Sequence, residues 1–311
     1  DAAFSQIDLW DSGEVKSAVT DQILYQGKKL SSRQKAFWRC RIADAKGQWS
    51  EWSQPASWTA GLLSADDWSA QWISAVEDVT HVTKENIQNF VGDASKGQLT
   101  LTPANHFRKE FTATKQVREA RLYTTALGIA DVEINGQRVA DDLFNPGWTN
   151  YHKRLHYRTY DVTKLIKNGG NAIGATLADG WYSGYVAYGL LVGVAGVDKQ
   201  FNGRYYYGKT PAFKAQLELS FDDGSKQTIV TDTSWKTATG PYLEADLLMG
   251  ETYDARKEYT RWSEAGFGDQ DWKSATIRVK HDLLPEPHPA APVRTIEEIK
   301  PISVREHSPG V

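Results

Sequence analysis

Cysteine and methionine are almost absent from this chain of 311 residues, which contains one of each. A single cysteine excludes an internal disulfide. Cys40 alternates with Trp38 and Ile42, so we expect it to be a buried core residue rather than a reactive thiol. No apolar run approaches the ~20 residues that a membrane-spanning helix needs, and the first residues, Asp-Ala-Ala-Phe, do not form a signal peptide.

An excess of charge of one sign is lacking as well. The formal net charge is -3, and the basic and acidic residues are interspersed. This pattern predicts neither a nucleic-acid partner nor binding to an acidic membrane. Three histidines, His106, His152 and His156, are too scattered for a zinc site, and no HExxH, GxSxG or phosphate-binding loop is present.

Aromatic residues, in contrast, are abundant, with 12 Trp and 14 Tyr. This usage is typical of all-β proteins that handle carbohydrate rather than of helical bundles. The length predicts two domains, and a hydrophobic fraction of 40% is enough to build their cores.

Residues 1–61 are expected to form part of a fibronectin type III-like β-sandwich. Arg39 and Arg41 alternate with apolar residues, and the pattern Trp49-Ser-Glu-Trp-Ser53 follows. Arginines on one segment can interleave with tryptophans on the next, each pair contributing about 0.5–1 kcal/mol when exposed. A sandwich of this type needs about seven strands in ~100 residues, so we expect a partial domain and a chain that is a fragment.

Residues 62–100 are predicted to be a linker followed by a long polar loop, because they have no periodicity. Residues 101–284 are predicted to form a β-sandwich of jelly-roll type. Asn135-Gly136, between alternating runs, predicts a tight hairpin. From Phe213 to Phe221, apolar and polar residues alternate as in a strand with one buried face.

Residues 285–311 are predicted to be a proline-rich connector that ends in the first strand of a following β-domain. Pro285, Pro287, Pro289 and Pro292 hold an extended chain and forbid a helix. Residues 293–304 then alternate sufficiently for one strand.

Two turns combine aromatic faces, amides and a carboxylate, the side chains that a sugar site uses. Asn145-Pro146-Gly147-Trp148 is the first turn, and Asp179-Gly180-Trp181-Tyr182 is the second. The alternative is that both are structural turns whose aromatic side chains pack against the sandwich. If they form a site, its carbohydrate-binding residues are Asp179, Trp181, Tyr182, Asn150 and Trp148.

Four sequence motifs resemble the N-terminal β-domains of bacterial α-L-rhamnosidases, which are large inverting glycosidases. They are LFNPGWTNYHKR (143–154), YRTYDVT (157–163), GGNAIGATLADGWYSG (169–184) and GETYDAR (250–256). The resemblance implies that this chain is a non-catalytic part, with no catalytic residue of its own. The catalytic α/α toroid is expected after Val311, and the protein is expected to be secreted or periplasmic.

In the rhamnose-binding members of this family the site depends on calcium. A deoxyhexose can lie with its apolar face on an indole ring while its hydroxyls bind oxygen donors or a Ca²⁺ ion. The candidate metal ligands are Asp179, Asn150 and Asn145. Gly180 supplies no side-chain amide beside the carboxylate, so this copy of the site is expected to bind weakly or not at all.

Two other functions are compatible with these patterns. One is a stand-alone carbohydrate-binding or adhesive β-module. The other is a hydrolase that uses Glu251 and Asp254, since glycosidases need two carboxylates on either side of the bond. Arg256 makes a structural ion pair with Asp254 the better interpretation, because a neighbouring cation lowers the pKa that an acid catalyst needs raised.

Overall fold

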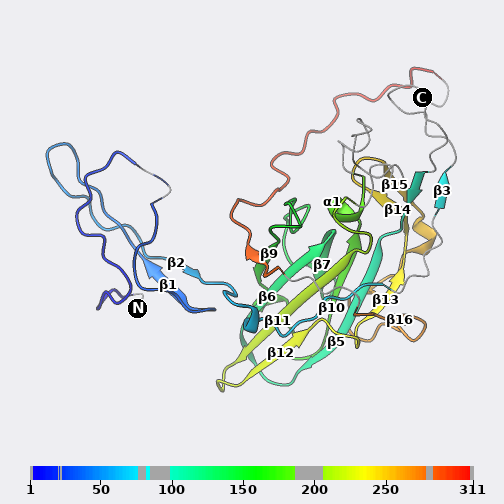
Figure 1. Ribbon diagram of the computed structural model, residues 1–311, viewed down its shortest axis with the longest axis horizontal. Helices are drawn as coiled ribbons and strands as arrows, with labels where there is room; N and C mark the ends of the chain where they lie inside the picture. Colours follow the sequence, from blue (N-terminus) through cyan, green and yellow to red (C-terminus); the bar gives the residue numbers. More distant parts are fainter. Residues whose placement is uncertain are drawn as a thin grey trace. The chain divides into compact units, whose positions relative to one another are not determined.

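The computed structural model confirms an all-β fold, in which the regular secondary structure of the described residues is almost entirely β-strand (Figure 1). Two compact units can be distinguished, an N-terminal unit (Asp1–Trp68) and a sandwich unit (Ser69–Val311). Among the described residues no helix is long and apolar enough to cross a membrane. The structure describes residues 3–19, 21, 23–75, 82–84, 99–185, 206–277 and 283–308.

The N-terminal unit contains a two-stranded antiparallel sheet and a row of stacked side chains. Its strands are β1 (Lys35–Trp38) and β2 (Ala56–Thr59), and a short 3-10 helix (Ala65–Asp67) follows. The Arg39 guanidinium carbon lies 4.6 Å from the centroid of the Trp52 ring. That of Arg41 lies 4.7 Å from the rings of both Trp49 and Trp52. The predicted interleaving of arginine and tryptophan is confirmed.

The prediction that Cys40 is buried is wrong. Cys40 is exposed, and its neighbours on the same side, Trp38 and Ile42, are 49% and 73% exposed. The backbone N–H groups of Cys40 and Ile42 donate to the hydroxyls of Ser53 and Ser50, each at 3.1 Å. Because the tryptophans pack on the arginine side of this segment, its apolar side faces solvent.

The sandwich unit is built from two sheets that face each other. The first has six strands in the order β16 (Lys273–Ser274), β13 (Lys236–Thr239), β5 (Asn105–Ala113), β10 (Gly169–Ala178), β7 (Ile129–Ile134) and β8 (Gln137–Arg138). The second has five, in the order β12 (Lys226–Val230), β11 (Ala212–Phe221), β6 (Val117–Leu127), β9 (His156–Asp161) and β17 (Glu286–Pro287).

Smaller elements complete this unit. β14 (Tyr242–Asp246) and β15 (Gly250–Tyr253) form a separate hairpin, and β3 (Val82–Lys84) pairs with β4 (Leu99–Leu101). Thr163–Leu165 and Ala255–Lys257 are 3-10 turns. The single α-helix of the described residues is α1 (Gly180–Ser183).

The local sequence signals explain the strand positions. Asn135 and Gly136 have φ angles of 52° and 81° and form the tight turn between β7 and β8, which confirms the hairpin. In β11, Leu217 and Leu219 point into the core as the alternation predicts. Gln216 on the opposite face is also buried. Residues 69–70 lie against it, and its side-chain oxygen accepts a hydrogen bond from the Ser69 N–H at 2.8 Å.

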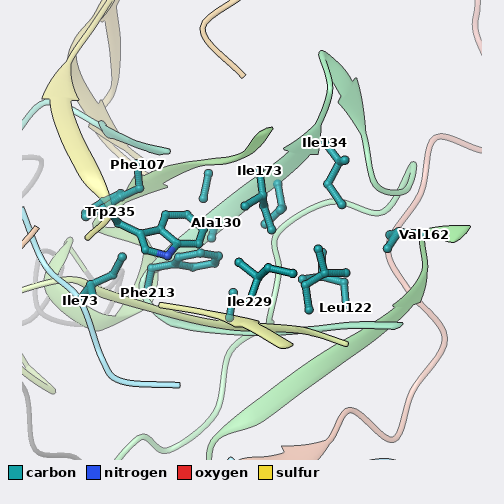
Figure 2. Close-up of a cluster of buried hydrophobic side chains, with 14 of the residues drawn as sticks. Ile73, Phe107, Leu122, Ala130, Ile134, Val162, Ile173, Phe213, Ile229 and Trp235 are labelled. Carbon is teal, nitrogen blue, oxygen red and sulfur yellow. The ribbon is translucent and has the colours of Figure 1, made fainter. Parts of the chain in front are cut away.

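The core lies between the two sheets (Figure 2). Ile173 and Phe107 from the six-stranded sheet face Phe213 and Leu122 from the five-stranded sheet, and Trp235 packs with them. Burial of each large apolar side chain stabilises the fold by about 1.5–3 kcal/mol. The turns that join the strands are thus held by a rigid scaffold.

Part of the predicted linker belongs to this sandwich. The Gln71 N–H donates to the Thr231 carbonyl at 2.8 Å, and Ile73 forms a β-bridge with Phe213. Residues 69–75 therefore contribute to the sandwich. The rest of the predicted polar loop lies outside the described residues, except for the two strands β3 and β4.

The strand predicted at residues 293–304 is not formed. Within residues 283–308 the described strand is β17, which pairs in parallel with β9. Ile296, Ile299 and Ile302 are almost fully exposed, and Val293 makes one bridge to Leu143. A strand needs a neighbour for its N–H and C=O groups, and alternation in sequence does not supply one.

Candidate functional site

In the second of the two turns identified in the sequence, the two aromatic side chains differ in burial. The second turn is the helix α1, which begins directly after β10 and Asp179. Tyr182 on this helix points inward and packs with Leu127, Tyr151 and Leu155. Trp181 lies at the edge of the same cluster and is partly exposed. Two adjacent residues of this helix thus differ in role: Tyr182 is structural, whereas Trp181 is partly open to a ligand.

Phe144, Trp148 and the partly exposed Trp181 form a group at the surface that we call the aromatic surface. The indole rings of Trp148 and Trp181 are parallel within 2°, with centroids 6.1 Å apart. Phe144 meets Trp181 edge to face at 6.2 Å. Trp148 is 54% exposed and Phe144 is 43% exposed. The structure therefore brings together two of the predicted residues, Trp148 and Trp181.

A buried tyrosine holds the loop that presents Trp148. The Tyr151 hydroxyl donates to the Gly147 carbonyl at 3.2 Å, and its ring contacts Tyr182 and Tyr207 at 5.4 and 5.0 Å. The Trp148 Nε1–H donates to the Tyr207 hydroxyl at 3.3 Å. Burial raises the pKa of Tyr151, so this tyrosine stays neutral. These contacts with Tyr151 and Tyr207 thus hold the exposed Trp148 indole in place before any ligand binds.

The three side chains predicted to bind calcium are engaged elsewhere. Asp179 is buried, and its carboxylate accepts a hydrogen bond from the Thr102 hydroxyl. The side-chain oxygen of Asn145 accepts a hydrogen bond from the Arg158 guanidinium at 2.9 Å. The positive charge of Arg158 disfavours a calcium ion at the same oxygen. Asn150 is exposed, and its side-chain oxygen accepts from the His152 N–H at 3.1 Å.

These contacts do not favour a calcium site, because Asp179 is buried against Thr102 and the Arg158 cation lies beside Asn145. Among the described residues, no group of three or more His, Cys, Asp or Glu side chains could hold a metal ion. The calcium site therefore remains a prediction without support from the geometry.

Asp254 is a structural residue. Its carboxylate caps the 3-10 turn by accepting from the Arg256 N–H, and it pairs with the Arg256 guanidinium at 2.8 and 2.9 Å. The hydrogen bonds from Arg256 lower the pKa of Asp254, whereas a general acid needs a raised pKa. The geometry supports the ion pair that the sequence indicated.

A second feature, which the sequence did not indicate, lies on the outer face of the six-stranded sheet. It is a cleft of about 430 Å³ that we call the outer-face pocket. Its floor comes from β5, β7 and β10, and its walls come from the β14–β15 hairpin and the segment around Trp262. Glu251 lines this pocket, but Asp254 does not.

Comparison with known proteins gives two matches that together extend over most of the chain. The family described as the α-L-rhamnosidase N-terminal domain matches residues 115–297. This chain belongs to that family. Residues 2–64 match the Rha78A-like N-terminal immunoglobulin domain. An immunoglobulin-like class is thus shown for the N-terminal unit, while its fibronectin type III subclass stays a prediction.

Among curated relatives, an α-L-rhamnosidase of Alteromonas sp. (strain LOR) is 37% identical over 304 residues, which are 97% of this chain and 30% of the relative. One from Formosa agariphila is also 37% identical, with 96% and 30% covered. The chain thus spans less than a third of the length of these relatives.

Solved structures of α-L-rhamnosidases have the same fold. The enzyme from Dictyoglumus thermophilum is 33% identical, with a TM-score of 0.79 over 97% of this chain and 31% of that one. The enzyme from Streptomyces avermitilis, solved as a complex with L-rhamnose, is 28% identical, with a TM-score of 0.74 over 89% of this chain and 40% of that one.

Proposed function

We propose that the sandwich unit binds rhamnose-containing carbohydrate through the aromatic surface. The observation that carries this proposal is the pair of parallel indoles at the sandwich surface, of which Trp148 is exposed and Trp181 is partly exposed. A 6-deoxyhexose has an apolar face and a methyl group, which gain free energy when they cover an indole. Exposed Asn150 lies two residues after Trp148, where its amide can reach the sugar hydroxyls.

This binding would serve a larger enzyme. Family membership supports a parent protein that hydrolyses terminal α-L-rhamnosides of plant or algal glycans, with its catalytic domain in another part of the polypeptide. In such a protein the sandwich unit would hold or orient the glycan near the catalytic domain. A soluble polysaccharide is an extracellular substrate, so we place the parent protein outside the bacterial cytoplasm.

The expected affinity is low, because an open surface with two indoles buries little of the ligand. We expect dissociation constants of about 0.1–1 mM for a single rhamnose unit. Several units on one polysaccharide would raise the apparent affinity through multivalency.

Affinity electrophoresis tests the proposal. The chain should be retarded in a native gel that contains a rhamnose-bearing polysaccharide, and Trp148→Ala should reduce this retardation. Trp58→Ala, which removes an exposed tryptophan of the N-terminal unit, is the matched control and should leave the retardation unchanged. Equal mobility with and without polysaccharide would refute carbohydrate binding.

A further inference from the structure

The outer-face pocket exists because the central strand of its sheet carries small side chains on that face. Ile173, Ala175 and Leu177 of β10 point into the core, so Gly174, Thr176 and Ala178 point outward. A Cβ atom at Gly174 would lie 2.5 Å from Cζ3 of Trp262. The missing side chain thus allows the Trp262 indole to lie directly on the strand.

A buried arginine fixes this indole in place. Arg108 is fully buried, and its Nε–H donates to the Trp262 carbonyl at 2.8 Å. Its Nη2 donates to the Glu264 carbonyl at 3.0 Å, and the guanidinium pairs with Asp269 and Glu110. Ser263 adds a hydrogen bond to Glu133 of β7 at 2.6 Å. The pocket wall is therefore preorganised by the protein itself.

Aromatic rings and hydrogen-bonding groups converge on the same space. Trp262 and three tyrosines, Tyr242, Tyr253 and Tyr259, line the pocket. His106 on the floor is 4% exposed; its Nδ1 pairs with Thr176 at 3.0 Å, and its Nε2 lies beside Gly240, where a Cβ atom would come within 2.4 Å of it. Burial lowers the pKa of His106 to about 4, so the imidazole is neutral at pH 7.

The charge of the lining is unbalanced. Four carboxylates line the pocket, from Asp131, Glu133, Glu251 and Glu258, against the single cation of Arg138. Three of them accept a hydrogen bond from a neighbouring side chain: Asp131 from Arg138, Glu133 from Ser263 and Glu258 from Tyr253. Glu251 is exposed and is paired through its backbone with Ala245 of β14, while its carboxylate makes no hydrogen bond or ion pair to any described residue. Its acceptors are available to a ligand that donates hydroxyl hydrogens.

Because the described carboxylates form no group that could hold a metal ion, hydroxyl donors explain this lining better than a cation does. A volume of about 430 Å³ lies within the range of about 300–1,000 Å³ that small-ligand pockets occupy. We propose that the outer-face pocket is a second saccharide-binding site, separate from the aromatic surface and selective for an uncharged sugar unit. Uronate and sulfated sugars are excluded by the carboxylates.

The test is calorimetric titration of the whole chain carrying Trp148→Ala, which removes the most exposed of the three rings of the aromatic surface. The probes are the methyl glycosides of L-rhamnose, D-mannose and D-galactose, with sodium D-glucuronate as the anionic comparison. At least one neutral glycoside should bind, and glucuronate should bind at least about tenfold more weakly.

Variants of the pocket then locate the binding. Glu251→Gln should weaken it by about tenfold or more, the effect of a hydrogen bond to a charged group. Tyr253→Ala should weaken it further than Tyr253→Phe does, since the ring is exposed and the second change keeps its face. Glu297→Gln, at an exposed carboxylate outside the pocket, is the control and should change nothing.

Three outcomes would overturn the proposal: no neutral glycoside binds, glucuronate binds as well as the neutral sugars, or Glu251→Gln behaves like Glu297→Gln. Melting curves for each variant confirm that the fold is retained. Because Trp148 is already replaced, these titrations do not measure binding by the complete aromatic surface. Failure of the pocket proposal, on which the first proposal does not depend, can therefore be told apart from failure of the first proposal.

Discussion

The aromatic surface and the outer-face pocket differ in how the chain assembles them. The residues of the aromatic surface lie between Phe144 and Trp181, in two turns that also hold the sequence motifs. The pocket collects side chains from His106 to Trp262, on strands that are adjacent only in the folded sheet. The first offers open apolar faces, while the second offers carboxylates around a cleft with aromatic walls.

This difference suggests different ways of holding a sugar. A flat aromatic surface selects for an apolar face and tolerates variation in the hydroxyls, since each contact is non-directional. A pocket lined with acceptors selects for hydroxyl positions and for the absence of negative charge. Variants that separate the two surfaces can therefore sharpen or break the comparison.

The largest effect is expected at Arg108, whose buried guanidinium holds the segment that forms one wall of the pocket. Arg108→Met should destabilise the sandwich unit by about 3–5 kcal/mol, because it leaves Asp269 and two backbone carbonyls without their donor. Urea unfolding measures this change. Arg256→Met, which removes an exposed arginine, is the control and should leave the unfolding midpoint unchanged. An unchanged midpoint for Arg108→Met would show that the Trp262 segment is held by other contacts.

A smaller effect is expected from the protonation of His106. Its pKa is about 4 in the folded state because of burial, against about 6.5 in the unfolded chain, so the unfolded state binds the proton first as the pH falls. The stability that neutral His106 provides is thus complete above pH 6.5 and is lost as the pH falls towards 4, by about 2–3 kcal/mol.

Unfolding curves measured from pH 7 to pH 4 check this dependence. His106→Gln should make the fall shallower, whereas Trp148→Ala on the other surface should leave it unchanged. The same slope in all three proteins would mean that His106 is accessible to protons in the folded state.

The next effect concerns sugar affinity at the aromatic surface. Trp148→Ala and Trp181→Ala should each weaken binding of methyl α-L-rhamnoside by about 1–2 kcal/mol, because each removes one ring face. Calorimetric titration measures both, with Trp58→Ala as the control. In these variants the pocket should keep its neutral-sugar binding. A loss at both surfaces together would show that they are one site.

The smallest effect is expected from calcium removal. The side-chain oxygens of Asn145 and Asn150 and the carboxylate of Asp179 already accept hydrogen bonds, so EDTA should change neither sugar affinity nor melting temperature. Asp179→Ala should lower stability through the lost contact with Thr102. Binding that disappears in EDTA would restore the calcium site that the sequence predicted.

The sequence predicted the features that depend on neighbouring residues. Asn135-Gly136 fixes its own turn, and the alternation in β11 assigns Leu217 and Leu219 to the core, because these signals act within a few residues. The arginine–tryptophan interleaving is of the same local kind. The place of Trp148 and Trp181 in turns next to strands is also local, whereas their degree of exposure was left open by the sequence.

Features that depend on contacts distant in sequence were not predicted. Asp179 and Tyr182 point inward because Thr102 and Tyr151 lie beneath α1, which the turn sequence does not reveal. The pocket depends on Gly174 meeting Trp262, residues that are far apart in the chain. The small outward side chains of β10 are a signal that could have indicated a depression in the sheet.

The most direct test of carbohydrate binding by the aromatic surface is a crystal structure of this chain with methyl α-L-rhamnoside at about ten times its dissociation constant. The account predicts a pyranose ring whose apolar face lies on the indole of Trp148 or Trp181, at the ~3.5–4 Å of van der Waals contact. Bare indoles at that concentration, with sugar bound elsewhere or not at all, would contradict it.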